Sequence, residues 1–354
     1  MGCVMGHLRQ PQAPANVPDH RTLNLFITLA LPGPTGKTQV TKVFDRSQIS
    51  AALERIDAVS CIEEGFIAYS RSEAVVPPVG EMLFEDPRGE AHIKYGFIKG
   101  DDYFVVKIAS GFYDNFKLGL PTNSGLMLLF SQKTGELLAV LLDEGELTAV
   151  RTAAAGAVVA KYMAPNTVHR IGIIGAGDQA RRQLLMLDSV IACRDVTVWG
   201  VSQEEVNRYK QDLEALGYSV DTTLDPATVA NACNLIVTVT PARHALLHKD
   251  EIRPGTHITA IGSDTPEKQE LDSNILARAD IVVADSIEQC QTRGEIYQAT
   301  KAGLLEDNKA VELGNLIINQ KLRRSSDDQL TIADLTGVAV QDLQISKAVY
   351  KALS

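Results

Sequence analysis

Residues 170–187, RIGIIGAGDQARRQLLML, decide the fold of this 354-residue chain. An apolar stretch over 170–174 leads directly into Gly175-Ala176-Gly177-Asp178-Gln179-Ala180, and apolar residues at helical spacing follow. In this G-x-G-x-x-A pattern Gly175 permits a tight turn, Gly177 lets the backbone approach a pyrophosphate, and Ala180 lets the helix pack against the strand. The helix N-terminus offers unpaired N–H groups to the phosphates. This setting predicts a dinucleotide site.

The pattern of a strand, a turn and a helix repeats after this motif. Apolar segments at 195–199, 235–240, 257–261 and 281–284 alternate with segments of helical character, which is typical of βαβ units and a parallel sheet. We therefore expect an α/β protein with a Rossmann dinucleotide-binding domain over residues 166–286.

The preceding part of the chain has a different pattern. Short β-type runs between residues 90 and 142 are separated by turn residues and predict an antiparallel sheet. Apolar residues at helical spacing flank this sheet at 47–70 and 144–164. The first 45 residues hold several prolines and no periodicity, so we expect them to form a poorly ordered extension.

Composition excludes several classes of protein. The net charge is −10, which argues against a nucleic-acid binder. The longest apolar runs fall short of the roughly 18 residues that a membrane span needs. Five dispersed cysteines without a C-x-x-C pair suggest reduced thiols in a cytoplasmic protein. The seven histidines form no cluster that predicts a metal site.

The end of the second parallel strand leaves the choice of cofactor open. An acidic residue there would bind the ribose hydroxyls of NAD(H), and an arginine would favour the extra phosphate of NADP(H). The sequence has Gly200 and Val201 at these positions, followed by Ser202, which suits either cofactor.

Two motifs together resemble the ornithine cyclodeaminase/mu-crystallin family. They are LTAVRTAAA at 147–155 and the GAGDQA turn that follows it. Further matches occur in the same order at 106–108, 119–122, 260–272 and 336–342, so the resemblance covers about residues 46–350. The resemblance implies a composite α+β substrate and dimerisation domain, built from residues 46–165 and 287–354, with the Rossmann domain inserted between them. It also implies a homodimer.

The resemblance further implies roles for individual residues. Lys107 and Arg151 would contact the carboxylate of an amino- or imino-acid substrate, and Asp264 would be the catalytic acid or base. The residues expected along the cofactor, besides Gly175 to Gln179 and Ser202, are Thr122, Arg151, Thr152, Thr240, Ala260, Ile261 and Lys268.

General chemistry supports these roles, and it also offers structural explanations for the same residues that involve no ligand. Burial of Lys107 in an apolar strand would lower its pKa and suit it to proton transfer, although a strand lysine often keeps its ammonium in water. Arg151 lies on the inward face of its helix, where it needs an anionic partner such as Asp143 or Glu144. Asp264 follows a strand end, where ligands bind in such sheets, but it is also placed to cap a helix or turn.

One departure from the family concerns substrate binding. Many members carry an arginine after a Pro-Pro turn, but here the stretch at 76–80 has none, and Lys94 appears on the following strand. Together with the segment at 109–115, this feature resembles a branch that includes ectoine-utilisation cyclodeaminase-like proteins and iminosuccinate reductase. Lys94 either replaces the arginine, binds a second carboxylate, or is a solvated lysine. We favour the second carboxylate modestly over replacement, because Lys107 and Arg151 already serve one.

The expected activity is hydride transfer between NAD(H) or NADP(H) and the α-carbon of an imino or amino acid, as in an imine reductase or amino-acid dehydrogenase. One alternative is a cyclodeaminase, which releases ammonia without net redox change. A second is a non-catalytic, crystallin-like cofactor-binding protein, against which the retention of Lys107, Arg151 and Asp264 argues.

Overall fold

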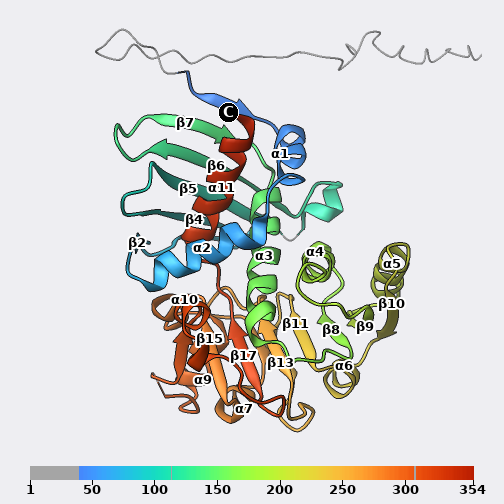
Figure 1. The fold of residues 1–354 in the computed structure, drawn as a ribbon. Coiled ribbons are helices and arrows are strands. Elements are labelled where there is room, and N and C mark those ends of the chain that lie inside the picture. Colours follow the sequence, from blue (N-terminus) through green and yellow to red (C-terminus); the bar gives the residue numbers. More distant parts are fainter. Residues whose placement is uncertain (1–39, 113, 307) are drawn as a thin grey trace, which may run out of the picture.

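The computed structural model describes residues 40–354 apart from 113 and 307. Two sheets dominate it, one above the other in Figure 1, with α3 (Glu146–Met163) running between them. Most of the predicted extension, residues 1–39, lies outside the described residues.

The first sheet has strand order β1-β7-β6-β5-β4-β2, with β3 paired to the outside of β4. Its long strands β4 to β7 are antiparallel, as the alternation of β runs and turns predicted. The bounds are β1 Lys42–Phe44, β2 Ala74–Val75, β3 Gly80–Phe84, β4 Gly89–Ile98, β5 Tyr103–Phe112, β6 Asn123–Ser131 and β7 Leu137–Leu141, with the short 3-10 helix η1 at Asn115–Leu118.

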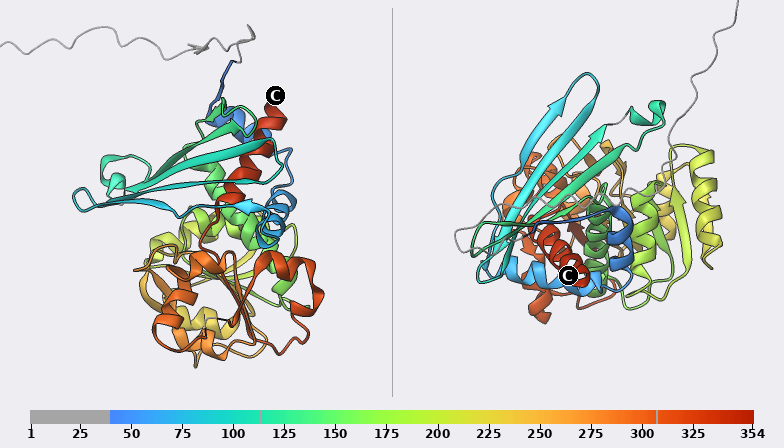
Figure 2. Two further views of the ribbon diagram at one scale, coloured as in Figure 1. Left: turned by 90° about the vertical axis from the view of Figure 1, so that its left-hand side faces the viewer. Right: turned by 90° about the horizontal axis from the view of Figure 1, so that it is seen from above.

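Helices cover one face of this sheet (Figure 2). α11 (Ala339–Leu353) packs across β4, β5 and β6, and α2 (Ala58–Ser70) packs against α3 and α11. The helical pattern at 47–70 is two helices, because α1 (Arg46–Leu53) ends before Asp57, whose side chain caps α2. Buried apolar side chains such as Ile62, Phe66 and Leu129 fill the space between helices and sheet.

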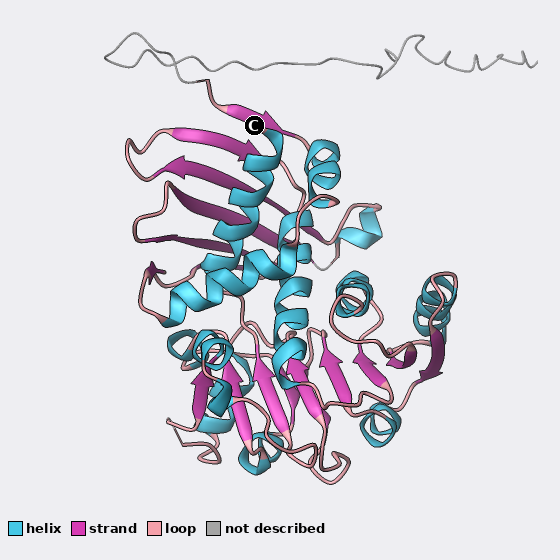
Figure 3. Cartoon of the chain, in the orientation of Figure 1, coloured by secondary structure: helices cyan, strands magenta, loops and turns pink. Residues whose placement is uncertain are grey.

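The second sheet is entirely parallel, with strand order β10-β9-β8-β11-β13-β17-β15-β16. This is the doubly wound arrangement of a Rossmann domain, and it confirms the predicted fold class. Its strands point toward the first sheet (Figure 3). The strands are β8 Ile171–Ile174, β9 Asp195–Trp199, β10 Ser219–Thr223, β11 Leu235–Thr238, β13 His257–Ala260, β15 Ile281–Ala284, β16 Ala310–Glu312 and β17 Thr331–Asp334.

Helices lie on both faces of this sheet, and a separate two-stranded ladder joins two of its loops. The helices are α4 Asp178–Leu187, α5 Gln203–Glu214, α6 Pro226–Ala232, α7 Ser273–Arg278, α8 Ile287–Cys290, α9 Gly294–Lys301 and α10 Leu313–Ile318, with the 3-10 helix η2 at Gln320–Leu322. The ladder pairs β12 (Arg243–Leu247) with β14 (Gln269–Leu271).

Two expected domain boundaries are wrong. β17 inserts between β13 and β15, and β16 forms the edge of the same sheet, so much of the segment after residue 287 belongs to the Rossmann domain. The chain returns to the first domain chiefly as α11. At the other end, β1 pairs with β7, so the first sheet begins before residue 46. Short strands such as β1 and β17 are defined by distant partners, which local periodicity does not reveal.

Among the described residues, no helix has the length and apolar character to cross a membrane.

Candidate active site between the two sheets

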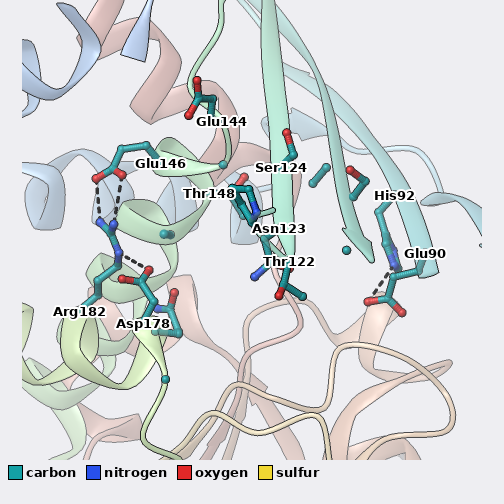
Figure 4. A pocket seen from close by; sticks show the side chains of 18 of the residues that line it. Glu90, His92, Thr122, Asn123, Ser124, Glu144, Glu146, Thr148, Asp178 and Arg182 are labelled. Atoms are coloured by element: carbon teal, nitrogen blue, oxygen red, sulfur yellow. Dashed lines mark hydrogen bonds and ion pairs between the residues drawn. The ribbon is translucent and has the colours of Figure 1, made fainter. Parts of the chain in front are cut away.

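A cavity of about 920 Å³ lies between the first sheet and the start of α4 (Figure 4). Its walls come from β4, β5, the segment 120–124, the beginning of α3, the glycine-rich turn and Asp264. In doubly wound sheets, ligands bind outside the carboxyl ends of the strands. The cavity is therefore where both a cofactor and a substrate would be expected.

The glycine-rich turn on the cavity wall is shaped for an anion. Gly175 has a φ of +114°, in the region that favours glycine, and its N–H donates to the carbonyl of Trp199 over 2.9 Å. No side chain caps α4 at Gly177, and a Cβ placed on Gly177 meets nothing within 4 Å. The free N–H groups and the open space fit a nucleotide pyrophosphate.

Arg181 stabilises the glycine-rich turn through hydrogen bonds to its backbone. Its Nη1 donates to the carbonyls of Ala176 over 2.6 Å and Gly177 over 3.1 Å, while its Nε donates to Asp212 over 2.8 Å. The amide nitrogen of Gln179, which lines the cavity, is buried and has no hydrogen-bond partner among the residues that the structure describes. An unpaired buried donor is costly, so this amide is suited to meet a ligand.

Three buried cations lie beyond the turn, around one carboxylate. Lys94 and Lys107 are directly opposite each other on β4 and β5, so both point to the same face of the sheet. Lys107 Nζ lies 3.2 and 3.1 Å from the two carboxylate oxygens of Asp342 on α11. Arg151 Nε lies 3.0 Å from Asp342 Oδ1, and its Nη1 donates to Gln341 over 2.9 Å. All four charged side chains are at least nine-tenths buried.

The cluster changes the acidity of its members. Burial lowers the pKa of Lys107 to about 7, and the charge of Arg151 adds to this effect while Asp342 opposes it. Burial likewise lowers the pKa of Lys94 to about 8, again assisted by Arg151. Burial favours the neutral form of a lysine, and neighbouring cations favour it further.

Lys94 is held by the turn that leads into α11. Its Nζ donates to the carbonyls of Thr336 over 3.0 Å and Gly337 over 2.7 Å. Asp285, at the end of β15, accepts from the Thr336 hydroxyl over 3.0 Å and the Gly337 N–H over 2.6 Å. Gly337 has a φ of +84°, and a Cβ there would lie 2.9 Å from Arg151 Nη1. The turn thus needs glycine for both its backbone angle and its space.

Asp264 lies on the Rossmann side of the cavity. Its Oδ1 accepts from Lys268 Nζ over 2.7 Å, and 40% of its side chain stays exposed toward the cavity. Burial alone would raise the pKa of Asp264, but the positive charge of Lys268 outweighs it and the pKa falls to about 2. The next helix, α7, begins only at Ser273, so Asp264 does not cap a helix, but it does precede a turn at residues 265–268, as the other half of that alternative expected.

Buried carboxylates hold the loop that carries Asp264. Glu295 accepts from the hydroxyl of Ser263 and from the N–H of Glu270 over 2.7 Å. Glu270 in turn accepts from the N–H of Thr240 over 2.6 Å and of Gly262 over 2.8 Å. These bonds connect the segment after β11 with the segment between β13 and β14, which carries Asp264.

His92 is a cavity residue that sequence reasoning missed. It is 9% exposed, and its ring nitrogens lie 3.5 Å from Glu81 and 3.8 Å from Glu90. Glu90 also lies 3.6 Å from Lys268, the partner of Asp264. The alternation of β4 could have identified His92, because residues two apart share the face that carries Lys94.

A charge network on the other wall joins the two domains (Figure 4). Arg182 of α4 donates to Glu146 of α3 over 2.8 and 3.1 Å and to Asp178 over 2.6 Å. Arg46 also lies 3.2 Å from Glu146. These ion pairs place the beginning of the substrate-side helix next to the glycine-rich turn.

The structure brings only some of the predicted site residues to the cavity. Lys94, Lys107, Thr122, Gly177, Asp178, Gln179 and Asp264 line it. The other predicted site residues are not among those that line the cavity: Arg151, Thr152, Gly175, Ala176, Ser202, Thr240, Ala260, Ile261 and Lys268. Thr152 donates its hydroxyl to the Thr148 carbonyl, and Ser202 caps α5.

The partner of Arg151 was not predicted correctly. The expected candidates were Asp143 and Glu144, but Arg151 contacts Asp342 and Gln341. Asp143 instead accepts from the N–H of Leu147 at the start of α3. Asp342 lies in the TGVAVQD stretch that supported the family resemblance, and a carboxylate within an otherwise apolar segment was its only signal.

Comparison with known proteins identifies the family. A profile of the ornithine cyclodeaminase/mu-crystallin family matches residues 39–354. The chain belongs to this family. It is 40% identical over 299 residues to an uncharacterised cyclodeaminase of Sinorhizobium fredii, covering 84% of this chain and 90% of the relative. The iminosuccinate reductase of Paracoccus denitrificans is 34% identical over 304 residues, with 84% and 90% covered.

Solved structures of similar proteins agree with the fold. An archaeal alanine dehydrogenase dimer with bound NAD superposes with a TM-score of 0.82 at 32% identity, covering 88% of this chain and 95% of that one. The Paracoccus denitrificans reductase in complex with NAD⁺ gives 0.80 at 30% identity, covering 88% and 96%. The predictions of family and of an enzyme are confirmed.

Proposed function

We propose that this family member reduces an α-imino acid to an amino acid with a nicotinamide cofactor, and catalyses the reverse oxidation. The observation that carries the proposal is the pair of buried lysines, Lys94 and Lys107, that line the cavity beyond the glycine-rich turn. Lys107 and Arg151 share the carboxylate of Asp342, and Lys94 interacts with the charges of Asp264, Asp342 and Asp285. Buried charges require compensation, so the cavity favours an anionic ligand such as a substrate carboxylate.

Lys107 is the cation best placed to bind that carboxylate. It lines the cavity, whereas Arg151 lies behind it and is held by Asp342 and Gln341. In the proposal, Lys107 donates to the substrate carboxylate, and Arg151 keeps Asp342 and Lys107 in position. A pKa of about 7 also suits Lys107 to exchange a proton near neutral pH.

Asp264 takes the opposite role. With a pKa of about 2 it is ionised, so it attracts the positive charge of a protonated imine or amine rather than supplying a proton. A substrate whose carboxylate binds Lys107 and whose nitrogen faces Asp264 has its α-carbon fixed between them. The nicotinamide would donate hydride to, or accept it from, that carbon.

The residues that would hold the cofactor are those of the glycine-rich turn. Gly177 leaves room for the pyrophosphate, and the backbone N–H groups at the beginning of α4 would donate to it. Gln179 and Thr122 line the cavity beyond the turn and are placed to contact the nicotinamide half.

The proposal is tested by following NADH oxidation with 2-oxo acids plus ammonia and with cyclic imino acids. The panel includes pyruvate, oxaloacetate and Δ1-pyrroline-2-carboxylate. We expect turnover with at least one imine, loss of turnover in Lys107→Met, and retained NADH binding in that variant. Turnover that persists unchanged in Lys107→Met would reject the assigned site.

The cyclodeaminase alternative has one observation in its favour, the 40% identity to a relative of that name. Cyclodeamination releases ammonia and leaves total NADH unchanged, whereas reduction consumes one NADH per product. Measuring ammonia and NADH together with a diamino acid such as ornithine separates the two reactions.

We further propose that the protein is a cytoplasmic homodimer. The face of the first sheet turned away from α11 exposes large apolar side chains such as Tyr95 and Ile108, and the neighbouring β3 exposes Leu83 and Phe84. A second copy would cover such a surface. The free cysteines of the described residues support a reducing compartment. Light scattering of the purified protein tests the dimer.

A further inference from the structure

The end of β9 lacks the residue that commonly selects the cofactor. In a doubly wound sheet, the strand next to the glycine-rich turn ends beside the adenosine ribose, and an acidic residue there binds the 2′-hydroxyl of NAD. In this chain β9 ends at Trp199 and is followed by Gly200. The bond from Gly175 N–H to the Trp199 carbonyl confirms that this strand end adjoins the turn.

The packing around Gly200 excludes an acidic side chain from that position. A Cβ on Gly200 would lie 2.8 Å from Val206 Cγ1 of α5 and 3.1 Å from Ala176 Cβ. Val206 is fully buried, so it has little freedom to move aside. A side chain at 200 would therefore push α5 or the glycine-rich turn out of place.

A carboxylate from the helix that follows reaches the same place. Glu205 Oε2 lies 3.7 Å from the Cβ position of Gly200. Ser202 accepts from the Glu205 N–H over 3.3 Å and so fixes the first turn of α5, from which Glu205 projects. Within the described part of the chain Glu205 makes no ion pair, whereas the adjacent Glu204 pairs with Arg208 over 2.9 Å.

The arginines on the flanking helices are engaged elsewhere. Arg181 of α4 is held by Asp212 and the carbonyls of the glycine-rich turn, and Arg208 of α5 is held by Glu204. A phosphate on the 2′ position of the ribose would meet the carboxylate of Glu205, while both guanidinium groups already have a carboxylate partner. A ribose hydroxyl would instead find an acceptor.

The geometry points to Glu205 as the residue that makes this protein select NAD(H) over NADP(H). Its carboxylate accepts a hydrogen bond from the 2′-hydroxyl and repels a 2′-phosphate. Glu205, in the first turn of α5, thus has the role that an acidic residue at the end of the strand usually has. This inference rests on the proposed use of a nicotinamide cofactor and adds which of the two cofactors binds.

The test is fluorescence titration of NADH and NADPH against the wild-type protein, Glu205→Gln and Glu214→Gln. The cap of α5 is the Ser202 side chain, so Glu205→Gln removes the charge and leaves the cap in place. Glu214 is the matched control, because it lies at the other end of α5 and pairs with Lys210. We expect the wild type to bind NADH at least about tenfold more tightly than NADPH, which corresponds to about 1.4 kcal/mol. Glu205→Gln should reduce that preference about tenfold, and Glu214→Gln should leave it unchanged.

The outcomes are distinguishable. An unchanged preference in Glu205→Gln, an equal loss in Glu214→Gln, or a wild-type preference for NADPH would overturn the role of Glu205 while leaving the proposed activity in place. Failure of the wild type to bind either nucleotide would overturn the proposed function itself. Melting temperatures of the variants establish that each is folded.

Discussion

Replacing Asp342 with asparagine should move the pH dependence of substrate binding. Asp342 is the carboxylate beside Lys107 Nζ, 3.1 Å away, and its charge raises a pKa that burial and Arg151 lower to about 7. An opposite charge at this distance typically contributes about 1–3 pKa units. In Asp342→Asn the pKa of Lys107 should therefore fall below its wild-type value of about 7, leaving more of the amine neutral at pH 7.

The magnitude follows from the loss of one charged hydrogen bond. A hydrogen bond to a charged group contributes about 1.5–3 kcal/mol, so kcat/KM at pH 7 should fall by about 10- to 150-fold. In the wild type, carboxylate binding should be strongest below pH 7 and weaken as the pH rises through 7, because Lys107 then loses its charge. In the variant this decline should begin at lower pH.

The assay is kcat/KM for imine reduction between pH 5.5 and 9, with NADH titrations to show that the nucleotide site is unaffected. Asp101→Asn is the matched control, because Asp101 pairs with Lys347 of the same helix α11 over 2.6 Å, outside the residues that line the cavity. An inflection that stays near pH 7 in Asp342→Asn, or that moves equally in Asp101→Asn, would refute the proposed role of Lys107.

Three further predictions concern the nucleotide turn, Lys94 and a buried histidine. Gly177→Val should abolish NADH binding by calorimetry yet keep its melting temperature, since a Cβ at Gly177 meets no neighbour; unchanged affinity would contradict the assignment. Lys94→Met should weaken mono- and dicarboxylic substrates about equally, because Lys94 Nζ is engaged by the Thr336 and Gly337 carbonyls; a kcat/KM loss confined to dicarboxylates would instead assign Lys94 to a second carboxylate. Burial lowers the pKa of His257 from 6.5 to about 3, so the histidine is protonated at a higher pH in the unfolded chain than in the folded one. The free energy of unfolding should therefore decrease as the pH falls from 6.5 toward 3, by at most about 5 kcal/mol. His257→Gln should flatten this part of the stability profile in urea unfolding, and an identical acid dependence would exclude that contribution.

Local signals were enough to predict the nucleotide half of the site. The glycine-rich turn is contiguous in sequence, and each of its characteristic residue types meets one structural requirement of a phosphate-binding turn. The alternation of strands and helices likewise predicts a parallel sheet without knowledge of distant contacts. The substrate half differs, because Lys107 and Asp342 meet only when α11, at the far end of the chain, packs on the first sheet.

The sequence-based expectations failed where partners are distant or where packing decides. Nothing local in the sequence shows that β17 inserts between β13 and β15. Lys94 lines the cavity, but its hydrogen bonds to two carbonyls 242 and 243 residues away could not be predicted from its own strand. Glu205 could not be singled out either, because only the crowding around Gly200 makes its position informative.

The route of the chain through β17 into α11 has a consequence for protein synthesis. Asp342 follows Lys107 by 235 residues, and the whole Rossmann domain lies between them. At about 5–20 residues per second, a ribosome needs roughly 10–50 s to cover that distance. Throughout this interval the emerging N-terminal sheet lacks both α11 and the carboxylate that neutralises its lysines. A nascent chain that stalls before residue 339 therefore presents an uncovered sheet face, which makes it a natural client for chaperones.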